Sequence, residues 1–181
     1  MENTKKILSF DAETNGLWGQ AFAIGAVLVD QDGEELARFV GRCPIEEEVN
    51  EWVEANVLPE LASVAETHAS YDDLLQDFMS WRATHKEGAV ELLHMGMPVE
   101  ARLFADAHAK GIIGDWDGPY GLVDVAALPE VGDSVDGYNS RNGVVVDPAD
   151  YEGGTHNPLY DSAAAAKCYL HWLANYKSNV E

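Results

Sequence analysis

The sequence predicts an α/β fold in which a mixed five-stranded sheet carries helices on both faces. Three β-rich runs come first, at 6–10, 22–29 and 35–41, and strands and helices then alternate along the chain. The turn at 31–33 suits a hairpin, which indicates that the first three strands are sequential and antiparallel. The order of elements therefore predicts a mixed sheet with its three antiparallel strands first.

Apolar side chains at intervals of three or four residues predict the later helices, and short apolar runs predict the later strands. In chain order these elements are a helix at 45–57, a helix at 71–81, a strand at 90–93, a helix at 98–110, a strand at 122–125 and a closing helix that begins at Pro158. Residues 129–155 are rich in Gly, Asp and Asn, which predicts a long flexible loop.

Size and composition favour one globular domain over residues 1–181. The apolar fraction is 46%, and no apolar run approaches the length of a membrane span, so no membrane partner is expected. Residues 1–6 lack the pattern of a secretory signal, and a cytoplasmic protein is expected. Cys43 and Cys168 form no CxxC pair, which favours small core residues over a disulfide or a zinc site.

The net charge of −21, from 32 acidic and 11 basic residues, argues against a broad surface for long duplex nucleic acid. Three explanations of this charge stay open. Carboxylates could hold cations that change the local sign, a short substrate could be captured at its end, or the proteome could be strongly acidic.

Two segments carry residues suited to metal-dependent chemistry. Asp11 and Glu13 lie two residues apart at the end of the first predicted strand, so both carboxylates point to the same face and suit Mg²⁺ or Mn²⁺. Far along the chain, His156 precedes the closing helix and Asp161 falls in its first turns. Taken alone, Asp11 and Glu13 are more typical of a solvated strand edge than of a catalytic site, and His156 and Asp161 are more typical of an exposed loop and a helix N-terminus.

Together these segments resemble the DEDDh family of 3′–5′ exonucleases, which belongs to the RNase H-like superfamily. The run from Phe10 to Leu17, followed by the strand at 23–27, resembles the first exonuclease motif. Residues 156–161 resemble the third motif, a histidine with four residues before the aspartate. The resemblance covers most of the chain, from Ile7 to about Trp172.

The second motif departs from the family pattern. Glu100, in the segment 97–104, stands where the family has an aspartate, and it keeps the charge on a side chain one methylene longer. Asp106 is the competing candidate, but it lies six residues further along the predicted helix and should point elsewhere. His94 and Asp124 also echo family positions, and both are interpreted as structural.

The resemblance implies an RNase H-like exonuclease fold and hydrolysis of phosphodiester bonds from the 3′ end of single-stranded RNA or DNA. It implies two divalent cations, Mg²⁺ or Mn²⁺, and His156 as the general base. The matching metal ligands, which are also catalytic, are Asp11, Glu13, Glu100 and Asp161. The matching contacts to the terminal nucleotide are Thr14 and Leu17, and Trp18 could add stacking.

Substrate, activity and assembly stay open at this stage. RNA is slightly favoured over DNA, because the single domain resembles the stand-alone exoribonucleases. The alternatives are a phosphodiesterase of a dinucleotide or nucleotide-derived signal, which the acidic charge favours, and a silent module that binds nucleic acid or protein, which only Glu100 supports. A homodimer is possible, with Trp116 and Trp172 as interface candidates, although core packing is the preferred use of Trp172.

Overall fold

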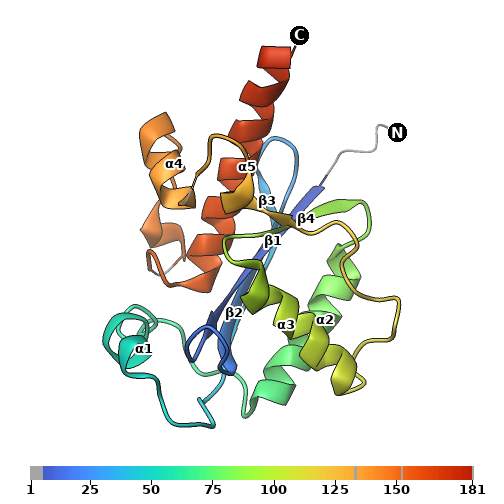
Figure 1. Cartoon of the computed structure of the whole chain (residues 1–181), viewed down its shortest axis with the longest axis vertical. Coiled ribbons are helices and arrows are strands. Elements are labelled where there is room, and N and C mark those ends of the chain that lie inside the picture. The colour runs from blue at the N-terminus through green and yellow to red at the C-terminus, as the bar shows by residue number, and fades with distance from the viewer. Residues whose placement is uncertain (1–5, 133, 152, 181) are drawn as a thin grey trace.

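The centre of the molecule is one mixed sheet (Figure 1). The computed structural model describes residues 6–132, 134–151 and 153–180, and within them five strands pair in the order β3-β2-β1-β4-β5. These strands are β1 (Lys6–Thr14), β2 (Ala21–Val29), β3 (Glu35–Arg42), β4 (Ala89–Leu93) and β5 (Val123–Asp124). The first three are antiparallel, whereas β4 and β5 run parallel to β1. The predicted fold class is confirmed.

Helices cover both faces of this sheet (Figure 1). The α-helices are α1 (Glu51–Asn56), α2 (Tyr71–His85), α3 (Met97–Ala109), α4 (Val135–Asn142) and α5 (Pro158–Val180), with short 3-10 helices η1 (Val125–Ala127) and η2 (Pro148–Tyr151). None of the described helices combines the length and the hydrophobicity that a membrane crossing needs. The expectation of a cytoplasmic location rests on residues 1–6. Apart from Lys6, these residues lie outside the part of the chain that the structure describes.

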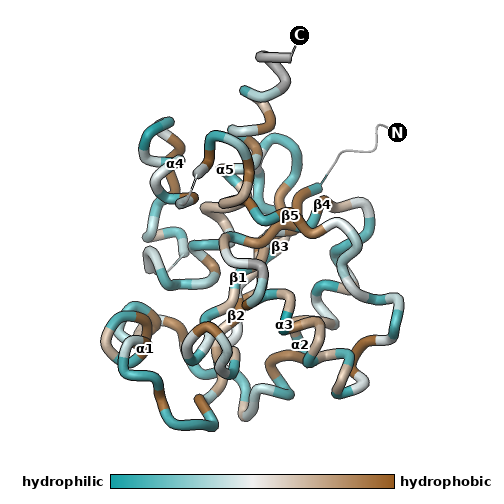
Figure 2. The backbone as a smooth tube through the Cα atoms, in the orientation of Figure 1, coloured by the Kyte–Doolittle hydropathy of each residue, from teal (hydrophilic) through white to brown (hydrophobic). Residues whose placement is uncertain are grey.

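Alternation along β1 divides the core into two parts. Leu8 and Phe10 pack in the cluster that includes α2 and α3, while Ile7 packs in the cluster that includes α5. Because successive side chains of a strand point to opposite faces, Asp11 and Glu13 lie on the α5 side. Figure 2 shows hydrophobic segments at the inner strands and hydrophilic ones on many of the outer loops.

The helix predicted at 45–57 begins later than expected, at Glu51. Asn50 caps it, because the Asn50 side chain accepts hydrogen bonds from the backbone N–H groups of Trp52 and Val53. The run of three glutamates precedes the cap, and Glu47 there accepts a hydrogen bond from Asn15. Those acidic residues therefore brace a loop instead of starting the helix.

The prediction of a long loop over 129–155 is wrong for its middle part. Helix α4 lies there, because Ser134 caps its first turn by accepting a bond from Gly137, and Gly143 ends it with φ 68°. Val135 and Tyr138 pack in the α5 cluster. The helix is short and poor in strong helix formers, so its stability depends on this packing.

Candidate active site

A cavity of about 430 Å³ opens where β1 ends. Its walls come from β1, α1, the end of β4, α3, α4 and the start of α5. Of the residues expected in the site, those that line it are Asp11, Glu13, Thr14, Leu17, Glu100, His156 and Asp161. Trp18 is not among the described lining residues and is 69% exposed beside them.

Three carboxylates from the two ends of the chain meet in this cavity. Oxygen atoms of Asp11, Glu13 and Asp161 lie within 4.8 Å of one another in the described part of the chain. Burial and the neighbouring carboxylates raise the pKa of Asp11 well above its usual range, and burial with Glu13 does the same for Asp161. Such repulsion is relieved by a bound cation or a proton.

Glu100 lies in the first turn of α3 and is 1% exposed. Burial raises the pKa of its carboxyl to about 8, with a further contribution from Asp124 and an opposing hydrogen bond from the backbone of Ala12. Its Oε2 is buried without a hydrogen-bond partner among the described residues. Asp106, the competing candidate, instead accepts a bond of 2.8 Å from the Tyr71 hydroxyl.

His156 faces the carboxylates from the loop before α5. Its backbone is left-handed, with φ 69°, and its N–H donates to Asp161 Oδ2 at 3.0 Å. Its Nδ1 lies 3.7 Å from Glu13 Oε1, and this carboxylate raises the pKa of His156 despite partial burial. The ring also meets Trp52 of α1 edge to face, with centroids 5.7 Å apart.

The spacing between His156 and Asp161 follows from how α5 begins. Asn157 precedes the helix and accepts a bond from the Leu159 N–H at 3.1 Å, and Pro158 occupies the first helical position. Asp161 therefore falls one turn into α5, where its carboxylate returns to the His156 N–H. The backbone geometry at the start of α5 therefore holds the His156 loop next to the Asp161 carboxylate.

Gly25 of β2 allows α5 to approach the sheet so closely. A Cβ atom on Gly25 would lie 2.2 Å from the backbone nitrogen of Leu159, which no side chain could tolerate. Ser162 adds a hydrogen bond of 2.9 Å from its hydroxyl to the Gly25 carbonyl. Since Asp11 pairs with Gly25 across β1 and β2, this contact places Asp161 beside Asp11.

Asn15 holds the loop that follows β1. Its side-chain oxygen accepts a bond of 2.7 Å from the Asn50 N–H, and its amide nitrogen donates to the Glu48 carbonyl at 2.8 Å. These bonds tie the loop to the entry of α1. Leu17 is consequently presented at the cavity wall while remaining 56% exposed.

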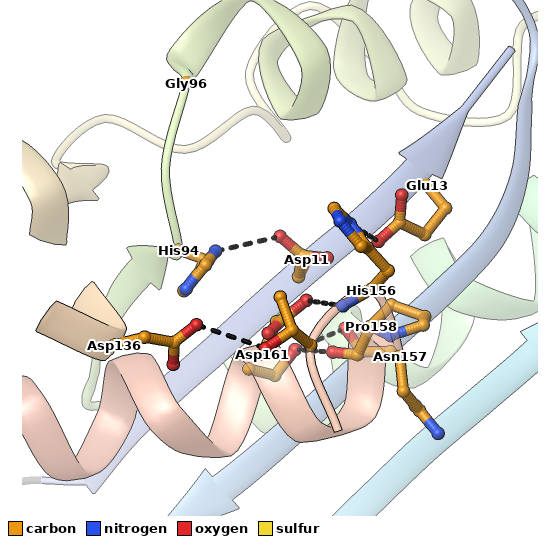
Figure 3. Close-up of polar contacts among 12 residues, drawn as sticks. Asp11, Glu13, His94, Gly96, Asp136, His156, Asn157, Pro158 and Asp161 are labelled. Carbon is orange, nitrogen blue, oxygen red and sulfur yellow. Dashed lines mark hydrogen bonds and ion pairs between the residues drawn. The ribbon is translucent and has the colours of Figure 1, made fainter. Parts of the chain in front are cut away.

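Sequence reasoning missed part of the site. His94, interpreted as structural, lies in the cavity wall just after β4, and its Nδ1 is 3.7 Å from Asp11 Oδ1 (Figure 3). Asp136 also lines the cavity, and it falls in the segment that the sequence predicts as a loop. The capping pattern of Ser134 and Gly143 was the signal that could have located it. Asp124 accepts a bond from the Gly96 N–H at 3.4 Å, which fits a structural role.

The fold and the site together define an α/β protein with a carboxylate cluster at the end of β1, the central strand of its mixed sheet. No protein-family model and no curated protein sequence matches the chain. Solved structures do match it. One, described as exonuclease X in complex with 5′ overhanging duplex DNA, has a TM-score of 0.60 and 17% identity and covers 94% of this chain and 93% of its own.

A second match is a product-bound structure of exonuclease I, with a TM-score of 0.54 and 13% identity. The alignment covers 96% of this chain but 47% of exonuclease I, so the chain spans about half the length of that protein. At these identities the likeness establishes the fold. The chain has the RNase H-like fold of these exonucleases, which confirms the resemblance seen in the sequence at the level of architecture.

Proposed function

We propose that this protein is a metal-dependent 3′–5′ exonuclease. The observation that supports it most is the meeting of Asp11, Glu13 and Asp161 with His156 in one cavity of an exonuclease-like fold. Carboxylates for cations and a histidine for proton transfer are the groups that phosphodiester hydrolysis needs. A plain structural cluster would not require four such residues from opposite ends of the chain.

The carboxylates of the cavity fit divalent cations. Oε2 of Glu100 and Oδ1 of Asp161 are buried without hydrogen-bond partners in the described residues, and buried carboxylates are unfavourable unless they are compensated. Oxygen ligands of this kind suit Mg²⁺ and Mn²⁺. Asp11, Glu13, Glu100 and Asp161 would hold two such cations, which when bound would acidify the attacking water and neutralise the leaving oxygen.

His156 would act as the general base. Its side chain is 37% exposed, so it can reach a water molecule in the cavity. Glu13 lies 3.7 Å from Nδ1 and orients the ring, leaving Nε2 to accept the proton of the attacking water. The bond from its N–H to Asp161 keeps this base close to the carboxylates.

Thr14 and Leu17 would contact the terminal nucleotide, because both line the cavity next to the carboxylates. Leu17 offers an exposed apolar surface for the last base, and the exposed Trp18 could stack on it or on its neighbour. The substrate proposed is the 3′ end of a single strand, with RNA slightly favoured. A homodimer remains a prediction.

A second candidate substrate is a dinucleotide or another small nucleotide-derived compound. The net charge of −21 favours it, since a long polyanion would be repelled by most of the surface. The chemistry and the residues would be the same. The two candidates differ in whether turnover depends on the length of the strand.

Degradation of 5′-labelled single strands tests the proposal. A short RNA, the equivalent DNA and a dinucleotide are each incubated with Mn²⁺, with Mg²⁺ and with EDTA, using the unmodified protein, Asp11→Asn and the matched surface variant Asp32→Asn. A metal-dependent ladder that shortens from the 3′ end and is lost only in Asp11→Asn is expected. Turnover of the dinucleotide alone would favour the small substrate, and no cleavage of any of them would overturn the proposal.

A further inference from the structure

A second group of possible metal ligands shares this cavity. His94 follows β4, Asp136 lies in the first turn of α4, and Asp161 lies in α5. One ligand atom from each lies within 4.8 Å of the other two, in the part of the chain that the structure describes. Figure 3 shows the His94 ring above Asp136 and to the left of Asp11, with Asp161 to its lower right.

The imidazole of His94 gives independent evidence that an ion binds to this group. The residue is 9% exposed, and its Nε2 is buried without a hydrogen-bond partner among residues 6–132, 134–151 and 153–180. Buried polar atoms are rarely left unpaired in folded proteins. Oδ1 of Asp161 is likewise buried without a partner among the described residues, so two polar atoms of the group are unpaired in a buried place.

The other nitrogen of His94 faces a carboxylate. Nδ1 lies 3.7 Å from Asp11 Oδ1 and faces this carboxylate in Figure 3. Histidines that bind metals generally direct one ring nitrogen to a carboxylate, which fixes the tautomer and leaves the other nitrogen for the metal. With Nδ1 facing Asp11, the second ring nitrogen of His94 points toward Asp136 (Figure 3).

We propose that His94, Asp136 and Asp161 form a second cation site beside the group of Asp11, Glu13 and Asp161, and that this second site prefers Mn²⁺ to Mg²⁺. One imidazole nitrogen with two carboxylates suits a divalent transition metal, whereas Mg²⁺ is bound by oxygen ligands. Asp161 belongs to both groups and would link the two sites. The site does not depend on nuclease activity, because it is defined by its ligands.

Pulsed electron paramagnetic resonance of bound Mn²⁺ tests the nitrogen ligand. Coupling of the Mn²⁺ electron spin to a nitrogen nucleus is expected in the unmodified protein and in His156→Asn, and it should disappear in His94→Asn. His68→Asn is the matched control, because His68 pairs with Asp77 at 3.1 Å outside the cavity. Loss of the coupling in His156→Asn alone, or its absence in the unmodified protein, would overturn the proposal.

Competition with Mg²⁺ tests the selectivity. With Mg²⁺ in large excess, the unmodified protein is expected to keep one Mn²⁺ per chain, and Asp136→Asn and His94→Asn should release it at least tenfold more readily. Circular dichroism would first show that each variant is folded. If Mg²⁺ displaces Mn²⁺ equally well from all three proteins, the preference for Mn²⁺ is wrong.

A variant of the neighbouring group separates this inference from the proposed function. Glu13→Gln removes a ligand of the first group, Asp11, Glu13 and Asp161, but none of the proposed Mn²⁺ site. It should therefore lose exonuclease activity while retaining the nitrogen coupling and the Mg²⁺-resistant Mn²⁺. Loss of that Mn²⁺ in Glu13→Gln would show a single cation centre and overturn the inference, whatever the activity of the unmodified protein.

Discussion

His94 and His156 approach the same carboxylates from opposite sides, and each places Nδ1 3.7 Å from one of them. Their surroundings are different. His94 is 9% exposed at the end of β4, whereas the His156 side chain is 37% exposed on a loop with left-handed backbone. Burial lowers the pKa of His94, while the Glu13 carboxylate raises the pKa of His156.

This comparison shows that proximity to a carboxylate does not decide the charge of a histidine. For the buried ring of His94, desolvation outweighs the opposing charges of Asp136 and Asp124, whereas for His156 the neighbouring Glu13 carboxylate outweighs partial burial. The two positions are accordingly suited to different tasks. A ring fixed in the core can hold a constant geometry, and a ring on an exposed loop can exchange protons with water.

The largest effect is expected for Asp161. This residue accepts a hydrogen bond from the His156 N–H and belongs to the same possible metal-binding group as His94. Asp161→Asn should lower exonuclease activity by at least ~10³-fold, since the loss of a metal ligand removes several kcal/mol of transition-state stabilisation. It should also raise the melting temperature in EDTA, because one buried charge is removed from the cluster. Kinetic assays and thermal melts would check both signs, with Asp32→Asn as the surface control.

A smaller loss of activity is expected when only the exposed histidine is removed. His156→Ala should lower kcat by roughly 10²- to 10⁴-fold, as is usual for a general base, and free imidazole should restore part of it. His108→Ala is a suitable control, because His108 is an exposed histidine that pairs with Asp115 at 2.6 Å. An unchanged kcat in His156→Ala would show that the exposed histidine is not the general base.

The pH dependence of the unfolding free energy reports how burial affects the charged form of Glu100, as it does for His94. Its folded pKa of about 8 exceeds the ordinary value of 4.5, so the folded chain binds the extra proton between these pH values. The stabilisation is complete below about pH 4.5 and is lost as the pH rises through about 8. Each unit of difference between the folded and unfolded pKa corresponds to about 1.4 kcal/mol of unfolding free energy.

Denaturant titrations in EDTA across this range should therefore show stability falling as the pH rises. Glu100→Gln should flatten the decline, whereas Glu87→Gln, which alters an exposed glutamate, should not. Saturating Mn²⁺ should raise the melting temperature and oppose the decline, because a cation replaces the proton as the compensating charge. If stability in EDTA instead rose with pH, the raised pKa of the buried Glu100 carboxyl would be wrong.

The smallest effect is expected at Trp18, which is exposed next to Leu17 of the cavity wall. Trp18→Ala should raise KM for a single strand about fivefold to tenfold with little change in kcat, the size expected for one lost stacking contact. Trp116→Ala is the matched control, because Trp116 is also exposed but lines a different cavity. Equal KM values for the two variants would show that stacking on Trp18 does not contribute to binding.

The sequence by itself determined the first half of the site. The pleat of β1 places Asp11 and Glu13 on one face, and the first turn of α5 sets the separation of His156 and Asp161. Both relations are local, because they depend only on the periodicity of a strand and of a helix. The mixed sheet was predictable for the same reason, since its elements are strongly patterned.

Only the tertiary structure decided how these pieces meet. His94, Asp136 and Asp161 lie on three separate elements, and no local periodicity relates them. Helix α4, which carries Asp136, is stabilised by the packing of Val135 and Tyr138 in the α5 cluster. Its sequence has a weak helix propensity of its own, so local patterning does not predict it. The burial that separates His94 from His156 is likewise a property of the assembled core, because solvent exposure is decided by the neighbours that folding brings together.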